Sequence, residues 1–159
     1  MSRSSASATV ISVGAIDQRS QTTHVQQVLR LSTQGKRLHN ITSAISELVA
    51  RSGVTTGLCT LFVQHTSASL VIQENADSDV LQDLEAFLAG LVPESAPYQH
   101  SAEGPDDMPA HIRTALTHTS EQIPIVHGQL GLGIWQGIYL WEHRQHGRTR
   151  EVVVHIMGG

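Results

Sequence analysis

The feature that most restricts the fold is the order of strands and helices along the chain. The last third carries only strand-like runs, at residues 123–126, 130–142 and 150–157, separated by short polar turns. Strands therefore outnumber helices and do not alternate strictly with them. This order predicts an α+β fold with a mostly antiparallel or mixed sheet and two to three helices.

The first two thirds supply the helices and further strands. Alternating or apolar runs predict strands at residues 24–31, 57–65 and 68–73. A first helix opens at Asn40 and closes at Gly53, a second begins at the capping residue Asp77, and a third runs from Pro109 to about Thr117. We expect one domain over residues 21–159, preceded by a partly ordered tail at residues 1–20.

Composition excludes several classes of protein. The 159 residues suit one domain with a buried core, and a single cysteine, Cys59, cannot form an internal disulfide. The chain has 10 Lys and Arg against 14 Asp and Glu, so we expect no nucleic-acid and no membrane partner. No apolar run is long enough to span a bilayer, and the polar first residues lack the core of a secretory signal. We therefore expect a cytoplasmic protein.

Ten histidines against one lysine, Lys36, make imidazole the main candidate for chemistry. His65 ends a predicted strand and is followed by the hydroxyls of Thr66 and Ser67. A strand end presents an imidazole rigidly, and hydroxyls can bond phosphate oxygens. The alternative is a polar turn in which His65 bonds the main chain.

A second candidate is the acidic segment at residues 74–79. Glu74, Asp77 and Asp79 could bind a hard cation such as Mg²⁺ through carboxylate oxygens. Helix capping is the alternative: Asp77 caps the helix, and Asp79 lies in its first turn, where an acid stabilises by about 0.3–1 kcal/mol. Capping does not explain Glu74.

The strongest candidate is the segment at residues 98–111, in which His100 and His111 flank three acids. A loop bent at Gly104 could turn both imidazoles toward one point, and His65 would be the third ligand of a catalytic zinc site. Asp106 or Asp107 could then orient an imidazole as a hydrogen-bond acceptor. The alternative is a surface loop whose acids cap the next helix.

The glycine-rich run at residues 128–142 does not match a dinucleotide-binding fingerprint, because it lies within strand-like sequence. Gln136 or Glu142 could project into a cleft. We expect Trp135 and Trp141 to lie in the core or at a subunit interface.

The remaining histidines offer weaker signals. We expect His143 and His146, in a turn beside Arg144 and Arg148, to be exposed to solvent. Five others have no acidic or histidine neighbour and are interpreted as structural: His24, His39, His118, His127 and His155.

Four motifs give the chain a resemblance to a known family. They are HTSAS at residues 65–69, ENADSD at 74–79, YQHSAEGPDDMPAH at 98–111 and GQLGLGIWQG at 128–137, and the match extends over about residues 24–158. With these motifs in this order, the sequence resembles the YjbQ-like family, often labelled secondary thiamine-phosphate synthase.

The resemblance implies a small α+β domain that forms a homotrimer, with sites near the subunit contacts. It also implies a weak transferase activity, which joins a hydroxymethylpyrimidine pyrophosphate to a thiazole phosphate and releases pyrophosphate. The family pattern indicates a metal set of His65, His100 and His111. We expect catalytic roles for Glu74, Glu103 and Asp107. Substrate-binding roles are expected for Thr66, Ser67, Asn75, Asp77, Asp79, Asp106 and Gln136.

Two positions depart from the family pattern. Gln73 stands where Asn is more frequent, and Ile134 stands where Thr is usual, so any contact made by that hydroxyl is lost.

The implied reaction is consistent with a metal. Displacing pyrophosphate needs positive charge at the leaving group, and few basic residues lie near the motifs, chiefly Arg113 and Arg144. Three neutral imidazoles suit Zn²⁺ better than Mg²⁺, which is the alternative. The expected ligand is a small phosphorylated metabolite. Two other functions stay open: a metal-dependent hydrolase using the same site, and a non-enzymatic trimeric binding module for a small anionic metabolite.

Overall fold

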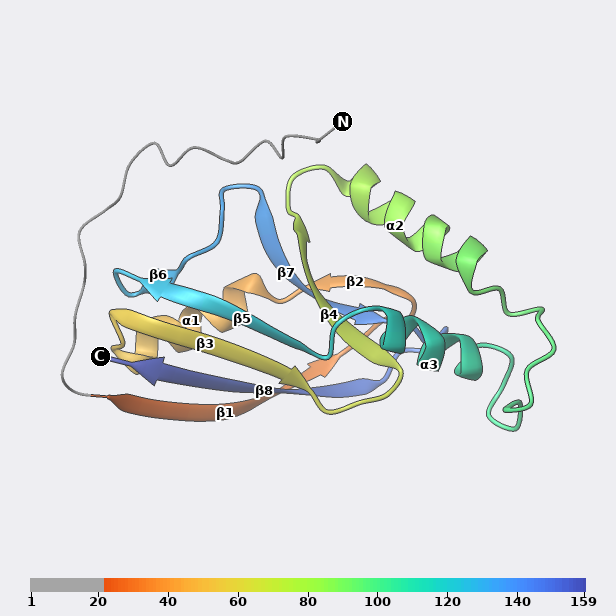
Figure 1. Cartoon of the computed structure of the whole chain (residues 1–159), viewed down its shortest axis with the longest axis horizontal. Coiled ribbons are helices and arrows are strands. Elements are labelled where there is room, and N and C mark those ends of the chain that lie inside the picture. Colours follow the sequence, from red (N-terminus) through yellow and green to blue (C-terminus); the bar gives the residue numbers. More distant parts are fainter. Residues whose placement is uncertain (1–21) are drawn as a thin grey trace, which may run out of the picture.

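The computed structural model describes residues 22–159, and the larger of its two sheets has five strands (Figure 1). These strands are β1 (Thr23–Ser32), β8 (Thr149–Gly158), β3 (Thr56–Val63), β5 (Ser120–Val126) and β6 (Gln129–Leu130), in that spatial order. Every neighbouring pair is antiparallel. The tail expected at residues 1–20 lies outside the described residues.

The second sheet has three strands, and several residues of the predicted sites lie on it or next to it. Its order is β2 (Arg37–Asn40), β7 (Gln136–Glu142) and β4 (Ala68–Glu74), again antiparallel throughout. β7 lies in the middle and is buried from Gly137 to Glu142. The α+β class with antiparallel sheets is thus confirmed.

Three helices complete the domain: α1 (Thr42–Ser52), α2 (Ser78–Leu91) and α3 (Asp107–Leu116). α2 and α3 lie together at one end of the molecule (Figure 1). No helix among residues 22–159 is long and apolar enough to cross a membrane.

Most helix ends lie at or near the residues that local sequence signals predicted. Gly53 adopts the left-handed conformation (φ 72°) that ends α1, and Asp77 Oδ1 accepts a hydrogen bond from Asp79 N at the start of α2. α1 begins two residues after Asn40, whose Oδ1 accepts from Thr42 N. α3 begins at Asp107 rather than Pro109. A proline is tolerated there because the first-turn amides have no partner within the helix.

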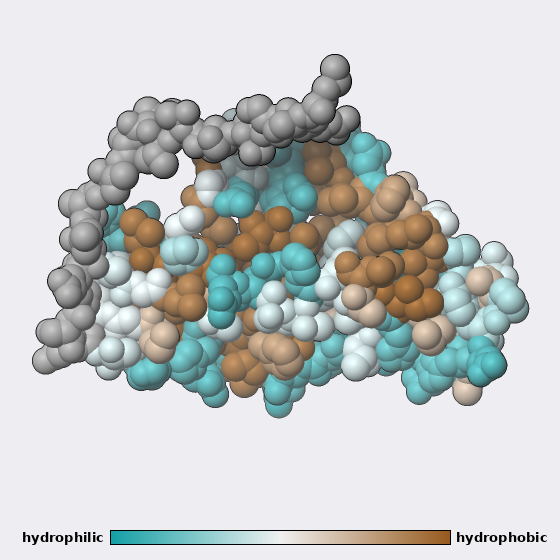
Figure 2. Space-filling view, in the orientation of Figure 1, coloured by the Kyte–Doolittle hydropathy of each residue, from teal (hydrophilic) through white to brown (hydrophobic). Residues whose placement is uncertain are grey.

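The core lies between the inner faces of the two sheets and α1. Its residues are all apolar and almost fully buried; they include Ile45, Val49, Leu61, Leu70, Ile123, Ile138, Leu140, Val154 and Ile156. On the face of the molecule seen in Figure 2, apolar side chains form separate patches divided by polar ones. Trp141 is buried, as expected, but Trp135 is 61% exposed and lies outside the core of this chain.

A buried ion pair connects the two sheets. Glu142, at the end of β7, is fully buried, and its carboxylate accepts from Arg150 Nε at 2.8 Å and Nη2 at 2.5 Å. Thr33 Oγ1 also donates to it, at 2.7 Å. Burial would raise the pKa of the Glu142 carboxyl, but the bonds from Arg150, Arg144 N and Thr33 lower it below its usual value. Glu142 does not project into a cleft.

Removing the cation of this pair should destabilise the fold strongly. Arg150→Gln leaves the Glu142 carboxylate buried without its counter-charge, and such a loss costs about 3–5 kcal/mol. Urea unfolding at pH 7 measures the change. The matched control is Arg30→Gln, because Arg30 pairs with Glu151 at the surface and is 77% exposed. The control should lose less than about 1 kcal/mol; equal losses in both variants would contradict this assignment.

His143, expected at the surface, is 1% exposed, so that prediction is wrong. It continues the buried run of β7, its ring lies 5.3 Å from that of Trp141, and its Nε2 is hydrogen-bonded to Ser69 Oγ at 2.8 Å. Burial, and after it the nearby charge of Arg113, lower the pKa of the imidazole to about 3. His146 is exposed, as expected.

The buried imidazole should make stability depend on pH. Between pH 6.5 and about 3 the unfolded chain protonates at His143 while the folded chain does not, so stability falls as the pH falls. Between pH 6 and 5 we expect the wild type to lose about 1 kcal/mol per pH unit more than His143→Gln. Urea unfolding at each pH measures this. His146→Gln, a change at an exposed position, should keep the wild-type slope; a slope unchanged in His143→Gln would refute the argument.

Candidate metal centre

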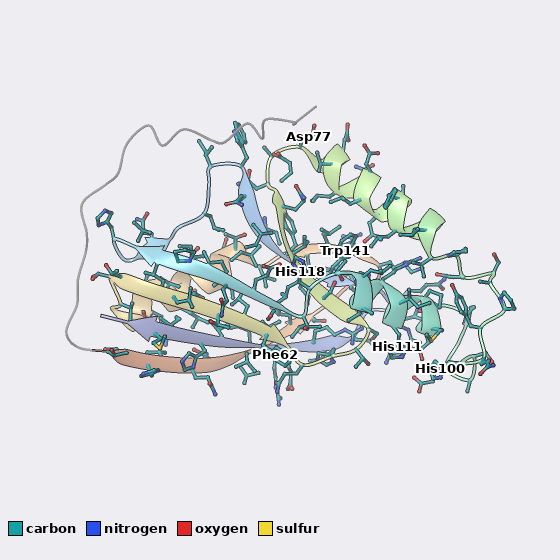
Figure 3. The ribbon with its side chains drawn as sticks, in the orientation of Figure 1. Phe62, Asp77, His100, His111, His118 and Trp141 are labelled. Carbon is teal, nitrogen blue, oxygen red and sulfur yellow. The ribbon has the colours of Figure 1, made fainter. Side chains whose placement is uncertain are left out.

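Three side chains that could ligate a metal converge where α3 begins. Asp107 is the first residue of α3, His111 lies one turn further on the same face, and His100 belongs to the preceding loop. One ligand atom from each lies within 4.8 Å of the others. Figure 3 shows His100 and His111 at the same end of the molecule. The structure thus brings together two of the three predicted metal ligands, and adds a carboxylate.

The Asp107 carboxylate is 3% exposed and bonded on both oxygens. His100 Nε2 donates to its Oδ2 at 2.6 Å, and Arg144 Nη1 donates to its Oδ1. Burial would raise the pKa of this carboxyl, but the hydrogen bond from His100 and the charge of Arg144 outweigh burial and lower it. Asp107 is therefore ionised at neutral pH, as a metal ligand must be.

Arg144 fixes the loop that carries the acids. Its Nε donates to Asp106 Oδ2 and its Nη2 to Glu103 O, each at 2.9 Å, while its own amide donates to Glu142 Oε1 at 3.0 Å. Asp106 also accepts from Gln145 N at 2.9 Å. Burial opposes ionisation of Asp106, but these bonds hold the pKa of its carboxyl below the usual value. Asp106 makes no side-chain cap for α3, so the capping alternative does not explain it.

His111 is oriented by its other ring nitrogen. Nδ1 donates to the carbonyl oxygen of Thr66 at 3.0 Å, which orients the ring so that Nε2 is the nitrogen turned toward the site. Nε2 lies 3.5 Å from Asp107 Oδ2. A carboxylate oxygen and an imidazole nitrogen thus face each other at a distance that a bound cation could bridge.

The donor set suits zinc. Catalytic zinc sites use three protein ligands, with imidazole nitrogens at about 2.0–2.1 Å and carboxylate oxygens at about 2.0–2.2 Å. Two such ligands on a tetrahedral ion lie about 3.3 Å apart. The separation of Asp107 Oδ2 from His111 Nε2, 3.5 Å, is close to this value, whereas His100 Nε2, 2.6 Å from Oδ2, would have to exchange its hydrogen bond for the ion. A charged carboxylate also makes the set more acceptable to Mg²⁺ than three imidazoles would be.

His65 does not join this group. Its Nε2 accepts a hydrogen bond from Glu151 N at 2.8 Å, and burial, followed by the charge of Arg150, lowers the pKa of its imidazole. The next two residues contact other groups. Ser67 Oγ accepts a hydrogen bond from Arg150, and Thr66 contacts His111 through its main-chain carbonyl oxygen. The ligand role of His65 and the substrate-binding roles of Thr66 and Ser67 stay predictions.

The other predicted residues gather at the far end of β4. Glu74 Oε1 accepts from Ala76 N at 3.0 Å and Asp77 N at 3.4 Å, which gives this acid the local role that capping had left open. Asn75 Nδ2 donates to the carbonyls of Ile134 and Gln136, at 3.0 and 3.2 Å. These bonds tie the end of β4 to the loop before β7.

The two groups do not form one site within a chain. Thr66, beside His111, lies just before β4, and Glu74 lies at the other end of this strand. β4 has seven residues, and at about 3.3 Å per residue it spans about 20 Å. Figure 3 shows Asp77 well apart from His100 and His111. The distant group comprises Glu74, Asn75, Asp77, Asp79 and Gln136. Of the predicted acids, Glu103, Asp106 and Asp107 lie at the metal centre, where the carboxylate of Glu103 is 67% exposed.

Sequence reasoning named Arg144 only as one of the few basic residues near the motifs. It did not predict that this side chain, 6% exposed, binds Asp106 and Asp107. One sequence signal could have indicated that Arg144 is buried: its position directly after β7. Glu142 and Arg144 follow an uninterrupted buried strand, and arginine is the cation that buried carboxylates pair with most often.

Comparison with known proteins assigns the family. The model of the UPF0047 protein YjbQ-like family matches residues 27–159. The chain belongs to this family. It is 66% identical to UPF0047 protein sll1880 of Synechocystis sp. over 84% of this chain and 91% of that protein. It is also 41% identical to UPF0047 protein YjbQ of Escherichia coli O157:H7 over 84% of this chain and 97% of that protein.

Solved structures of the family share the fold. A YbjQ-like protein of unknown function from Sulfolobus solfataricus superposes with a TM-score of 0.81 at 24% identity, covering 87% of this chain and all of that one. A protein of the yjbq/upf0047 family from Clostridium acetobutylicum gives a TM-score of 0.74 at 37% identity, covering 83% of this chain and 98% of that one. The resemblance seen in the sequence motifs is thereby confirmed as family membership.

The geometry predicts that Arg144 keeps Asp107 ionised. Arg144→Met removes the charge and the hydrogen bonds that lower the pKa, while burial, which raises it, remains. We expect the pKa of the Asp107 carboxyl to rise, as followed by ¹³C NMR titration of the side-chain carboxyl groups. Arg148→Met, a change at an exposed neighbour, should leave it unchanged. An unaltered pKa in Arg144→Met would contradict the role given to Arg144.

Proposed function

We propose that this chain is a metal-dependent enzyme acting on a small phosphorylated metabolite, with the metal held by His100, Asp107 and His111. The observation that carries the proposal is the convergence of three ligand atoms, one each from His100, Asp107 and His111, within 4.8 Å of one another. In such a site a bound divalent ion, zinc in the first place, would supply the positive charge that stabilises a leaving pyrophosphate or activates a water molecule.

The protein's own cations support the need for this charge. Arg144 is bonded to Asp106, Asp107 and the Glu103 carbonyl, so its guanidinium has little capacity left for a substrate phosphate. Lys36 forms an ion pair with Glu94. A phosphorylated substrate at this end of α3 therefore finds few free positive groups among the described residues.

Within this proposal, the favoured reaction is the thiamine-phosphate synthase-type transfer implied by the sequence resemblance. Glu103 is the candidate acid or base, because its carboxylate is exposed beside the metal centre and only 4.0 Å from Arg144 Nη1. Glu74 lies at the other end of β4, so it could act here only from a neighbouring subunit. We therefore keep the homotrimer, in the cytoplasm, as part of the proposal. It would let the group at residues 74–79 of one subunit approach the metal centre of another.

Metal content and turnover of one preparation test the proposal. Untagged protein purified without chelator should carry near-stoichiometric zinc or another divalent metal by mass spectrometry. The metal should be lost in His100→Ala, His111→Ala and Asp107→Asn, because each change removes one ligand atom. His65→Ala should retain it, since His65 Nε2 is engaged by Glu151 N. His127→Ala, an exposed turn position, is the matched control. Wild-type protein that carries no metal would contradict the proposal.

The same samples distinguish the reactions. Release of pyrophosphate from hydroxymethylpyrimidine pyrophosphate that requires the thiazole phosphate, and that falls at least about tenfold in His111→Ala, supports the synthase. Release that ignores the thiazole phosphate supports the metal-dependent hydrolase. Metal retained without any turnover supports the binding module for a small anionic metabolite.

A further inference from the structure

The outer face of the large sheet carries a second pair of histidines, away from the metal centre. His24 on β1 and His155 on β8 point to the same face, because Gln26 pairs with His155 in the register and His24 lies two residues before it. His24 Nδ1 lies 3.3 Å from His155 Nε2, and the ring centroids are 5.5 Å apart. Their neighbours in the sequence, which include no acid and no histidine, predict only structural roles for both.

Gln26 orients this pair. His155 Nδ1 donates to Gln26 Oε1 at 3.1 Å, so a neutral His155 keeps its proton on Nδ1 and presents the lone pair of Nε2 toward His24. A ligand histidine usually has its second ring nitrogen bonded in this way. His24 lies on the exposed surface and His155 is half-buried, so solvent reaches the space between the two nitrogens.

We propose that His24 and His155 form a second, surface site for a divalent transition metal, in which the ion replaces the proton shared between Nδ1 and Nε2. Two imidazole nitrogens 3.3 Å apart, each about 2.05 Å from a metal, subtend about 107° at the ion, close to the tetrahedral angle. Zn²⁺, Ni²⁺ and Cu²⁺ are the ions that imidazole ligands favour. Water would complete the coordination at this open position.

The site would connect an edge strand to its neighbour. β1 is the edge of the large sheet and pairs only with β8 among the described strands. His24 is the second residue of β1, so an ion bound to it and to His155 would hold the beginning of this strand in place. This end of β1 lies at the opposite side of the molecule from α3 (Figure 1). The two metal sites should therefore bind independently.

Zinc titration of the untagged full chain, stripped of metal, tests the proposal. The titration uses Zn²⁺ alone in a background of His100→Ala and His111→Ala, so that the first centre cannot contribute. One equivalent should bind and should be lost on adding His24→Gln or His155→Gln. Adding Gln26→Leu should weaken binding about 10–100-fold, because it removes the hydrogen-bond partner that orients the ligand His155. Adding His127→Gln is the matched control, at an exposed histidine in a turn, and should keep the equivalent.

A spectroscopic measurement on the intact wild type keeps the test independent of how those variants fold. Two-bond ¹H–¹⁵N spectra of the histidine rings should show Zn²⁺ shifting His155 Nε2 and His24 Nδ1, with His155 Nδ1 still protonated. An unchanged equivalent in His24→Gln and His155→Gln, or absent shifts at these nitrogens, would overturn the proposal. Because the first centre is removed in the titration, failure of one site does not imply failure of the other.

Discussion

The buried carboxylate of Glu142 is the constraint on which much of the structure depends. An ionised group with no solvent exposure must be compensated within the protein. Here Arg150 supplies the charge, and Thr33 and the amide of Arg144 supply further hydrogen bonds. Those partners come from the end of β1, from β8 and from the turn after β7. One carboxylate thereby fixes the corner where both sheets meet.

The candidate metal centre is built outward from that corner. The backbone of Arg144 is held by Glu142, and the side chain of Arg144 then holds Asp106 and Asp107. Asp107 in turn positions His100, while Thr66, just before β4, positions His111. The loop that carries His100 has no regular structure of its own, and these charged hydrogen bonds attach it to the turn after β7 and to α3.

Local signals in the sequence predicted the elements well and the long-range contacts poorly. Gly53 and Asp77 mark helix ends through interactions within a few residues, and the structure confirms both. The acids and histidines at residues 100–111 could be grouped because a helix places Asp107 and His111 one turn apart. No local pattern shows that Arg144 reaches across 37 residues to Asp107, or that His143 continues a buried strand. In the sequence, the motif that contains Glu74 stands directly before the motif that contains His100, Asp107 and His111. In the fold, the length of β4 separates the two groups.

The two histidine pairs differ in the charge that surrounds them, and this difference sets what each can do. At the first centre the buried, ionised Asp107 adds a negative charge beside the two imidazoles, and this charge favours a divalent ion. At His24 and His155 the nearest oriented partner is the neutral amide of Gln26, and water competes at an open surface. The first site is therefore the stronger candidate for retaining a metal. The second has the properties of a clip between β1 and β8, occupied only when the ion is available.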